Sequence, residues 1–235
     1  MNTSELKGYL TGLIIGDGYI DKGVNKRAFR IKTTHKDFAD KIYEDLNSCN
    51  TFDITMSYHK EKTDKHNVHH KEYWELYVKA HPYFNKKYNN FYDDYRNRRI
   101  TKNAINWLTP NGLANWYMSD GYVCLVGKTK GRIRSRRLEI CTDRYTFENV
   151  KMVCNELLKK FDIDFQPIKR NDCYRIRLRT FDYTKFINII KPYVVPSMLY
   201  KLYLGYEQQP KWMSDEDWDF QNSISAIALT DKAEG

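Results

Sequence analysis

The sequence predicts a mixed α+β fold in which one αββαββα unit occurs twice along the chain. Residues 10–19 and 113–122 both read as an apolar helix that closes on Asp-Gly-Tyr, 103 positions apart. The pattern of strand and helix residues at 29–38 then returns at 138–147, an offset of 109. Repetition at this period indicates a duplicated unit, and 235 residues accommodate two copies. We therefore expect two pseudo-symmetric halves, each with its own antiparallel sheet.

The first unit is assigned to residues 1–100. Its expected elements are helix 5–16, strands 18–24 and 27–33, helix 36–48, strands 53–60 and 71–79, and helix 82–95. Helix 36–48 is predicted from apolar residues at helical spacing, Phe38, Ile42 and Leu46. Strand 71–79 is predicted from strict alternation, which puts the side chains of Tyr73, Glu75, Tyr77 and Lys79 on one face.

The second unit, residues 101–212, repeats this order. Its expected elements are helix 110–119, strands 121–126 and 134–141, helix 146–160, strands 163–169 and 173–179, and helix 182–191. Thr109-Pro110 provides an N-cap and a first helical residue. In the last strand three arginines alternate with apolar residues, so they share one sheet face. Such a face indicates a polyanion beside it.

Charge distribution indicates nucleic acid as the partner. The net charge is +9, but the segment 213–235 holds six acids and one base, so residues 1–212 carry +14. Because lysine and arginine neutralise phosphates, nucleic acid is the first partner to test for this basic body. The five cysteines are scattered, which argues against a disulfide framework or a zinc ribbon and for a reducing compartment. No run of about 18 apolar residues exists, so a transmembrane helix is excluded, and we expect no targeting segment.

Glycines on the first helix predict a close helix pair. Gly8, Gly12 and Gly16 form one bare stripe, which costs helix stability and so calls for another backbone nearby. The corresponding stripe of the second helix is Asn111, Asn115 and Ser119, which is less small. We therefore expect a pairing that is looser or partly polar.

If the two helices pair in parallel, Asp17 and Asp120 meet. Adjacent carboxylates repel, and the pKa of one rises unless cations lie between them. Mg²⁺ prefers such ligands, with water and phosphate oxygens completing its shell. The carbonyls of Gly16 and Ser119 are expected as further ligands. A single helix ending in Asp-Gly is usually only a C-cap, but two in register, each followed by the same strands, favour a site.

At these residues the chain resembles the LAGLIDADG homing endonucleases in their single-chain, two-repeat form. The first motif matches at Leu10, Gly12, Leu13, Ile14, Asp17 and Gly18, and the second at Leu113, Ala114, Asp120 and Gly121. The resemblance covers roughly residues 5–205. It implies a monomer whose two motif helices pair and whose two acids each serve one strand of double-stranded DNA. It further implies a double-strand break across the minor groove that leaves short 3′ overhangs.

The resemblance also implies the remaining parts of the site. Mg²⁺ is the expected cofactor, and Mn²⁺ or Ca²⁺ can occupy the same sites, Ca²⁺ without cleavage. Residues 196–202 resemble the segment that supplies a lysine near the scissile phosphate, so Lys201 is the residue of the second half expected to polarise phosphate or water. In the first half Arg99 is preferred over its neighbour Arg98. Because arginine does not shuttle protons as lysine does, equal cleavage of the two strands is in doubt.

A further family position follows the second strand of each half and borders the metal site. It falls at Thr34 and at Asp143, and Asp143 has the alternative of pairing with Arg144 or Arg137. These two residues complete the set expected to lie against DNA near the cleavage site.

DNA readout is expected from the outward residues of both sheets, each sheet forming a saddle in the major groove. In the first half these are Arg30, Lys32, Thr55, Ser57, His59, Tyr73, Glu75, Tyr77 and Lys79. In the second half they are Arg132, Arg134, Arg136, Gln166, Lys169, Arg175, Arg177 and Arg179. The loop lysines Lys60, Lys62 and Lys65 are expected to meet phosphates. The histidines at 66, 69 and 70 indicate a polar loop rather than a metal cluster.

Two other functions fit the same scaffold. One is an RNA maturase that assists intron splicing, and the other is a regulator that binds DNA without cutting it. The presence of both acids favours the nuclease. We expect no membrane contact and no obligate protein partner, and we expect synthesis where the intron is encoded, in an organelle, a bacterium or a phage-infected cell.

Overall fold

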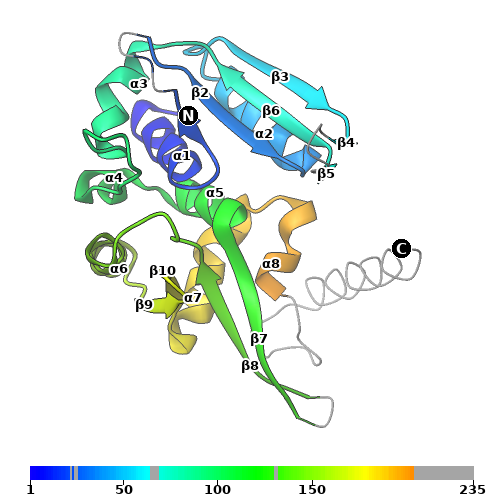
Figure 1. The fold of residues 1–235 in the computed structure, drawn as a ribbon, viewed down its shortest axis with the longest axis vertical. Helices are drawn as coiled ribbons and strands as arrows, with labels where there is room; N and C mark the ends of the chain where they lie inside the picture. Colours follow the sequence, from blue (N-terminus) through cyan, green and yellow to red (C-terminus); the bar gives the residue numbers. More distant parts are fainter. Residues whose placement is uncertain (22, 24–25, 64–68, 130–131, 204–235) are drawn as a thin grey trace.

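The computed structural model describes residues 1–21, 23, 26–63, 69–129 and 132–203, without the side chains of residues 70, 124–129, 132–136 and 203. It contains two stacked halves with the helices α1 (Thr3–Ile15) and α5 (Pro110–Asp120) between them (Figure 1). The repeat predicted from the sequence is therefore confirmed. The acidic segment 213–235 lies outside the described residues.

The first half has a sheet of strand order β1-β2-β6-β3, with every pairing antiparallel. Its elements after α1 are β1 (Tyr19–Ile20), β2 (Phe29–Thr33), α2 (Lys36–Asn47), β3 (Ile54–His59), a short pair β4 (Lys62–Thr63) and β5 (His69–His70), β6 (Tyr73–Val78), α3 (Pro82–Lys87) and a 3₁₀ turn, Tyr88–Asn90. The helix α4 (Lys102–Trp107) connects to the second half.

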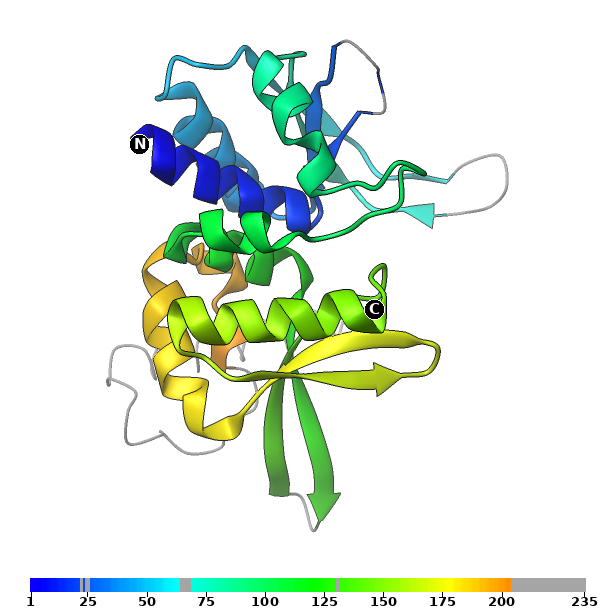
Figure 2. The ribbon, with the colours of Figure 1, turned by 90° about the vertical axis from the view of Figure 1, so that its left-hand side faces the viewer.

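The second half has the corresponding order β7-β8-β10-β9, again antiparallel. Its elements after α5 are β7 (Gly121–Thr129), β8 (Arg132–Ile140), α6 (Phe147–Phe161), β9 (Phe165–Arg170), β10 (Cys173–Leu178), α7 (Tyr183–Ile190) and α8 (Tyr200–Tyr203), with 3₁₀ turns at Thr180–Asp182, Lys191–Tyr193 and Pro196–Met198. The β7–β8 ribbon extends beyond the body of the molecule (Figure 2).

Each sheet buries one face beneath a helix, so the other face stays outward. In the first sheet Ile31 and Leu76 are register partners with no exposed surface, and α2 packs over them. In the second sheet Ile140 and Ile176 play the same part beneath α6. Burial of such side chains contributes about 25 cal/mol per Å² of apolar surface removed from water. This alternation leaves the polar residues of both sheets facing away from the core.

The helix pair is tighter than the sequence predicted. A Cβ atom added to Gly12 would lie 1.8 Å from the carbonyl oxygen of Gly112, and one added to Gly112 would lie 2.1 Å from that of Gly8. The residue of α5 that contacts Gly8 and Gly12 is Gly112. The prediction that Asn111 belongs to the contact stripe is therefore wrong. Ser119 does face Gly16, and Asn115 is fully buried, so the expected polar character is present. Backbone contact of this kind fixes where both helices end.

The predicted helix 82–95 is wrong beyond residue 90. The helix gives way to a 3₁₀ turn, and Tyr92 then pairs with Arg98 as an isolated β-bridge. Asp93 caps the intervening turn by accepting a hydrogen bond of 2.7 Å from the backbone amide of Asn97. Stacking of Tyr88 on Tyr92, with ring centroids 4.4 Å apart, holds this fold-back in place. The reversal carries Arg98 to the end of α1.

In the part of the chain that the structure describes, no helix is long and apolar enough to span a membrane.

Candidate functional site

The two acids meet at the common end of the helix pair. Asp17 follows the C-cap of α1, Asp120 is the last residue of α5, and both line one cavity of about 200 Å³. Burial, with the charge of Asp17 adding to it, raises the pKa of Asp120 to about 7. Burial also raises the pKa of Asp17, against the opposing charges of Lys201, Arg144 and Arg98. The sequence-predicted meeting of the two acids is thus present in the structure.

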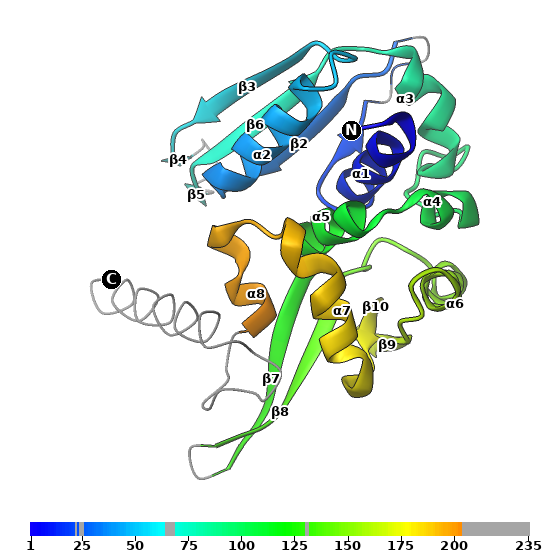
Figure 3. The same cartoon turned by 180° about the vertical axis from the view of Figure 1, so that it is seen from behind.

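Lys201 lies at the end of α5. Its ammonium donates hydrogen bonds to the carbonyl oxygens of Met118 and, at 3.4 Å, Ser119. The segment that carries it lies between α2 and β7 (Figure 3). Burial lowers the pKa of this ammonium, while Asp17 and Asp120 raise it. Its placement beside the acids agrees with the role expected from the sequence.

Arg98, rather than Arg99, occupies the equivalent place at the end of α1. Its guanidinium donates to the carbonyl oxygens of Ile14 and Gly16, both at 3.0 Å, and of Gly18. The guanidinium of Arg99 donates instead to the carbonyl of Asn89, away from the acids. Our preference for Arg99 is therefore corrected. The reason is the Tyr92–Arg98 bridge, which directs Arg98 inward and its neighbour outward.

These two cations are related by the repeat. Arg98 and Lys201 are 103 positions apart, the same offset as the two acids. Each holds the last carbonyls of one motif helix, so each complements the negative end of that helix. The carbonyls of Gly16 and Ser119, expected as metal ligands, consequently already accept hydrogen bonds from these side chains.

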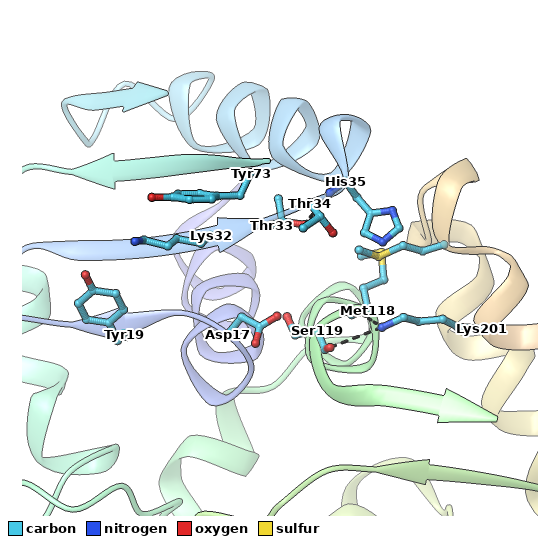
Figure 4. Close-up of a pocket in the computed structure, with 11 residues that line it drawn as sticks. Asp17, Tyr19, Lys32, Thr33, Thr34, His35, Tyr73, Met118, Ser119 and Lys201 are labelled. Atoms are coloured by element: carbon cyan, nitrogen blue, oxygen red, sulfur yellow. Dashed lines mark hydrogen bonds between the residues drawn. The ribbon is translucent and has the colours of Figure 1, made fainter. Parts of the chain in front are cut away.

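Two cavities flank the acids, one beside each cation. The lysine cavity, about 410 Å³, is lined by Asp17, Lys201, Thr34 and His35 among others (Figure 4). The arginine cavity is the 200 Å³ cavity named above, which Arg98 and Arg144 also line. Each is composite, because the cation comes from one half and the strand-to-helix turn from the other. Asp17 lines both cavities and Asp120 lines the arginine cavity.

Asp143 lies in the arginine cavity, and its ion-pair partner differs from both that we considered. It accepts two hydrogen bonds of 2.7 Å from Arg175, rather than pairing with Arg144 or Arg137. Hydrogen bonds from Arg175 outweigh partial burial and lower the pKa of Asp143. Asp143 therefore stays a carboxylate that orients an arginine of the sheet face.

The outer face of the first sheet carries the predicted residues in rows. Arg30 and Thr55 flank Tyr77, Lys32 and Ser57 flank Glu75, and His59 pairs with Tyr73. Glu75 accepts from two sides, with Arg30 at 3.5 Å and His59 at 3.4 Å. Lys79 lies at the edge of this face in an exposed ion pair with Asp53. All nine predicted residues thus lie on or beside one outward surface.

The outer face of the second sheet is organised around Glu139, a residue that the sequence analysis did not single out. Its side chain is 0% exposed and accepts hydrogen bonds from Tyr122, Arg170 and Arg177. Gln166 pairs with Arg177 in register, and Arg179 pairs with Asp164 at 3.4 Å. With Arg175 on Asp143, three of the predicted arginines, Arg175, Arg177 and Arg179, are therefore held by carboxylates on the surface where DNA is expected.

Lys169 is a wrong assignment. It pairs in register with Tyr174, whose ring packs against Phe147 of α6, so its strand position belongs to the helix-covered face. Phe165 faces the core, so the alternate residues Gln166 and Arg170 of β9 lie on the outer face. The side chains of Arg132, Arg134 and Arg136, and the residues Lys65 and His66, lie outside the described part of the structure.

Other residues at the site carried weaker signals in the sequence. Tyr145 donates to the carbonyl oxygen of Ile15 at 3.2 Å, and burial raises the pKa of its phenol to about 12. His35 and Arg144 occupy the same turn in each half. Alignment of the two strand-to-helix turns could have identified this pair, whereas nothing local marks Tyr145. Among the described residues no group of three or more His, Cys, Asp or Glu side chains is placed to hold a metal.

Comparison with known proteins places these features in a family. A family model described as the LAGLIDADG DNA endonuclease family matches residues 7–186. A probable intron-encoded DNA endonuclease 3 of Mycosarcoma maydis is 30% identical over 56% of this chain and 93% of its own length. A cytochrome b mRNA maturase bI2 of Saccharomyces cerevisiae is 25% identical over 81% of this chain but only 45% of its own length.

A solved structure shares the fold. The homing endonuclease I-WcaI, bound to its DNA recognition sequence, superposes with a TM-score of 0.71 at 22% identity, over 85% of this chain and 86% of that one. The likeness supports the two-repeat α/β architecture.

Proposed function

Because the chain belongs to the LAGLIDADG DNA endonuclease family and is therefore a DNA endonuclease, we propose that it is a metal-dependent homing endonuclease. It would hydrolyse both strands of a long duplex target and leave short 3′ overhangs. The observation that carries this proposal is the meeting of Asp17 and Asp120 in one cavity at the end of a backbone-to-backbone helix pair. A single chain supplies both acids, so the proposed active form is the monomer.

The donor set fits divalent metal. Two carboxylates share a recess in which burial and mutual repulsion raise the pKa of Asp120, so a cation between them is favoured. Mg²⁺ is the proposed ion, with Mn²⁺ as a substitute and Ca²⁺ as a non-cleaving occupant. When bound, such a metal would acidify a water and stabilise the leaving oxygen of a phosphodiester. Arg98 and Lys201 donate hydrogen bonds to the carbonyls of Gly16 and Ser119, and each carbonyl oxygen keeps a second lone pair. We therefore propose that the two carboxylates hold the metal and that these carbonyls supply further ligands.

The chain's cations have a separate role. Lys201 and Arg98 are each fixed by hydrogen bonds to helix carbonyls, so their positive charges stay beside the acids without reorganisation. Preorganised charge of this kind stabilises the negative charge that develops on a phosphate in the transition state. We assign one cation to each scissile strand.

The two outer sheet faces are the proposed DNA interface. Their arginines and lysines suit guanine edges and phosphates, and their tyrosines, serines and threonines add hydrogen bonds. Arg175 and Arg177 are preordered by Asp143 and Glu139, which fixes their direction before DNA arrives. Rigid donors favour discrimination among sequences rather than uniform affinity. The relatives named as intron-encoded support a coding site within an intron.

Replacing the acids tests the proposal. Asp17→Asn and Asp120→Asn should each lower double-strand cleavage in Mg²⁺ at least about 10³-fold, while the DNA dissociation constant in Ca²⁺ changes little. Asp40→Asn is the matched control, since Asp40 sits in an exposed pair with Lys36 on α2 and should leave cleavage intact. The substrate is a duplex recovered by selection from a randomised library or the intronless form of the host gene. Full cleavage by either active-site variant would refute the assignment.

The alternative is an RNA maturase. The similarity to a protein named as a maturase favours it, although this chain spans under half of that relative's length. An in vitro splicing reaction with the surrounding intron separates the two functions. Splicing stimulated by wild type and retained by Asp17→Asn would support the maturase.

A further inference from the structure

His35 is a histidine of the lysine cavity that the proposed mechanism has not yet used. It occupies the N-cap position of α2, two residues after the end of β2, and its half-buried ring lines the cavity together with Asp17 and Lys201 (Figure 4). It belongs to the first half, whereas Lys201 comes from the second. The cavity thus places a titratable ring, a carboxylate and an ammonium around one open space.

The hydrogen bonds of the ring define its tautomer. Ser197 donates its hydroxyl proton to a carboxylate oxygen of Asp37 at 2.6 Å, and its backbone amide donates to the other oxygen at 2.9 Å. A serine hydroxyl has one proton, so the Ser197 oxygen can only accept in its 2.8 Å contact with Nδ1 of His35. Nδ1 therefore carries the ring proton, and Nε2 of the neutral ring bears a lone pair.

The surroundings keep this ring neutral and fixed. Burial and the charge of Lys201 lower the pKa of His35, against the smaller opposing effect of Asp37. Tyr200 stacks on the ring with centroids 6.4 Å apart. The charged and titratable groups facing the ring or lining its cavity are Asp37 of α2, Asp17 at the end of α1, Tyr19, Lys32 and Tyr73 of the first sheet, and Lys201 and Tyr200 of α8.

The corresponding turn of the other half carries no imidazole, although Asp120 and Asp143 line the arginine cavity as carboxylates. Arg144 occupies the corresponding turn, 109 positions after His35, the offset that relates the two strand-to-helix regions. It lines the arginine cavity. A guanidinium stays protonated and has no acceptor atom, so it cannot take a proton from water. The two cavities therefore differ in acid–base chemistry as well as in size.

We propose that His35 is a catalytic residue for one strand only, with Nε2 accepting the proton of the water that attacks the scissile phosphate in the lysine cavity. This rests on the proposed nuclease function. The water oxygen forms a bond to phosphorus while its proton passes to Nε2, and the bond from phosphorus to the 3′ oxygen breaks. The leaving oxygen takes a proton from solvent, and the imidazolium then returns its proton to solvent.

Strand-resolved kinetics test this. A duplex that wild type cleaves is labelled separately on each strand and cut under single-turnover conditions in Mg²⁺. His35→Ala should slow one strand about 10²-fold, the size of a general-base contribution, and leave the other within about twofold. Lys201→Met should slow the same strand. Arg144→Ala is the matched control from the equivalent turn and should slow the opposite strand.

Two conservative variants separate proton acceptance from mere positioning. His35→Gln can accept a hydrogen bond but not a proton, and His35→Arg copies the residue of the other half; both should be as slow as His35→Ala. In wild type the ratio of the rate on the affected strand to the rate on the other strand should fall as the pH drops below the ordinary histidine pKa, about 6.5, and the variants should lack this change in ratio. The ratio is the readout because the pKa of Asp120, about 7, gives wild type and variants alike a loss of rate in the same pH range.

The outcomes are distinguishable from failure of the function itself. If wild type cuts neither strand in Mg²⁺, the proposed nuclease function is wrong and the role of His35 is wrong with it. If wild type cuts both strands and His35→Ala cuts both at the wild-type rate, the inference about His35 alone is overturned. Full activity of His35→Gln would likewise overturn proton acceptance. Gel-shift affinity in Ca²⁺ should be unchanged for all four histidine and arginine variants.

Discussion

The lysine cavity and the arginine cavity are built on one repeated plan yet end in different chemistry. In both, a cation holds the last carbonyls of a motif helix, and a turn from the opposite half closes the other side. One cavity combines Lys201 with His35, and the other combines Arg98 with Arg144. Duplication therefore preserved position and positive charge, while the pairing of a lysine with a histidine occurs in one cavity and a pair of arginines in the other.

Removing each cation in turn tests whether the two cavities act separately. Lys201→Met should lower the rate on one strand about 10²- to 10³-fold, and Arg98→Met should do so on the other, because each loses preorganised charge beside one phosphate. The measurement is single-turnover cleavage of a duplex labelled on each strand. Lys36→Met, on the exposed surface of α2, provides the control with unchanged rates. Equal slowing of both strands by either variant would show that the cavities do not act separately.

The two sheets each hold a carboxylate among cations, and the two carboxylates, Glu139 and Glu75, differ in how deeply they are buried. Glu139 is fully buried among Tyr122, Arg170 and Arg177, whereas the side chain of Glu75 keeps 14% of its surface beside Arg30 and His59. Removing one partner of a buried charge cluster costs about 3–5 kcal/mol, and a partly exposed one about 1 kcal/mol or less. Glu139→Ala should thus lower the free energy of unfolding far more than Glu75→Ala, measured by urea denaturation. Equal losses would contradict the difference in burial.

The same acid predicts a pH dependence. Burial would raise the pKa of Glu139, but hydrogen bonds from Tyr122, Arg170 and Arg177 outweigh it, so the folded pKa is lowered. A carboxyl with a lowered folded pKa contributes stability above its unfolded value, about 4.3, and this contribution is lost as the pH falls through the folded pKa. Wild type should therefore lose stability between pH 5 and lower pH more steeply than Glu139→Gln. Parallel curves would contradict this.

Two glycines along the helix contact, Gly12 and Gly16, should show a smaller loss of folding stability when they are replaced. Gly12→Ala places a Cβ 1.8 Å from the backbone of Gly112, while Gly16→Ala meets the side chain of Ser119 at 2.6 Å. Both should destabilise by about 1–3 kcal/mol through overpacking. Adding Ser119→Gly should restore stability to Gly16→Ala, because the new Cβ at residue 16 clashes with the side chain of Ser119 and not with its backbone. No substitution at residue 112 should rescue Gly12→Ala; rescue there would contradict backbone contact.

The sequence predicted the fold in detail because its signals were local and periodic. Alternation in 173–179 and helical spacing in 36–48 each reported a buried face, and repetition reported the topology. The predicted meeting of Asp17 and Asp120 followed from the glycine stripe together with the repeated Asp-Gly helix ends and parallel pairing of the two helices. Helix 82–95 was overextended because its interruption depends on tertiary pairing of Tyr92 with Arg98, which no local pattern reveals.

The site was less predictable for the same reason. Choosing between Arg98 and Arg99 required knowing which way a loop turns, since the two neighbours point in opposite directions. The partner of Asp143 was Arg175, which lies on a strand 32 positions later and becomes adjacent only in the folded sheet. The sequence did not identify Glu139 because an acid on an arginine-rich strand is expected to be solvated. In the structure it is the centre of a cluster with Arg170 and Arg177.

We propose that one pair of acids serves two unequal catalytic cavities, with Asp17 lining both and Asp120 lining the arginine cavity. This inequality is measured in a time course of supercoiled plasmid carrying the selected target, cut by wild type in Mg²⁺, with the nicks mapped on each strand. We predict that nicked circles accumulate before linear product and that nearly all first nicks fall on the strand whose cleavage requires Lys201. Simultaneous cutting of both strands at one rate, with no nicked intermediate, would contradict the claim.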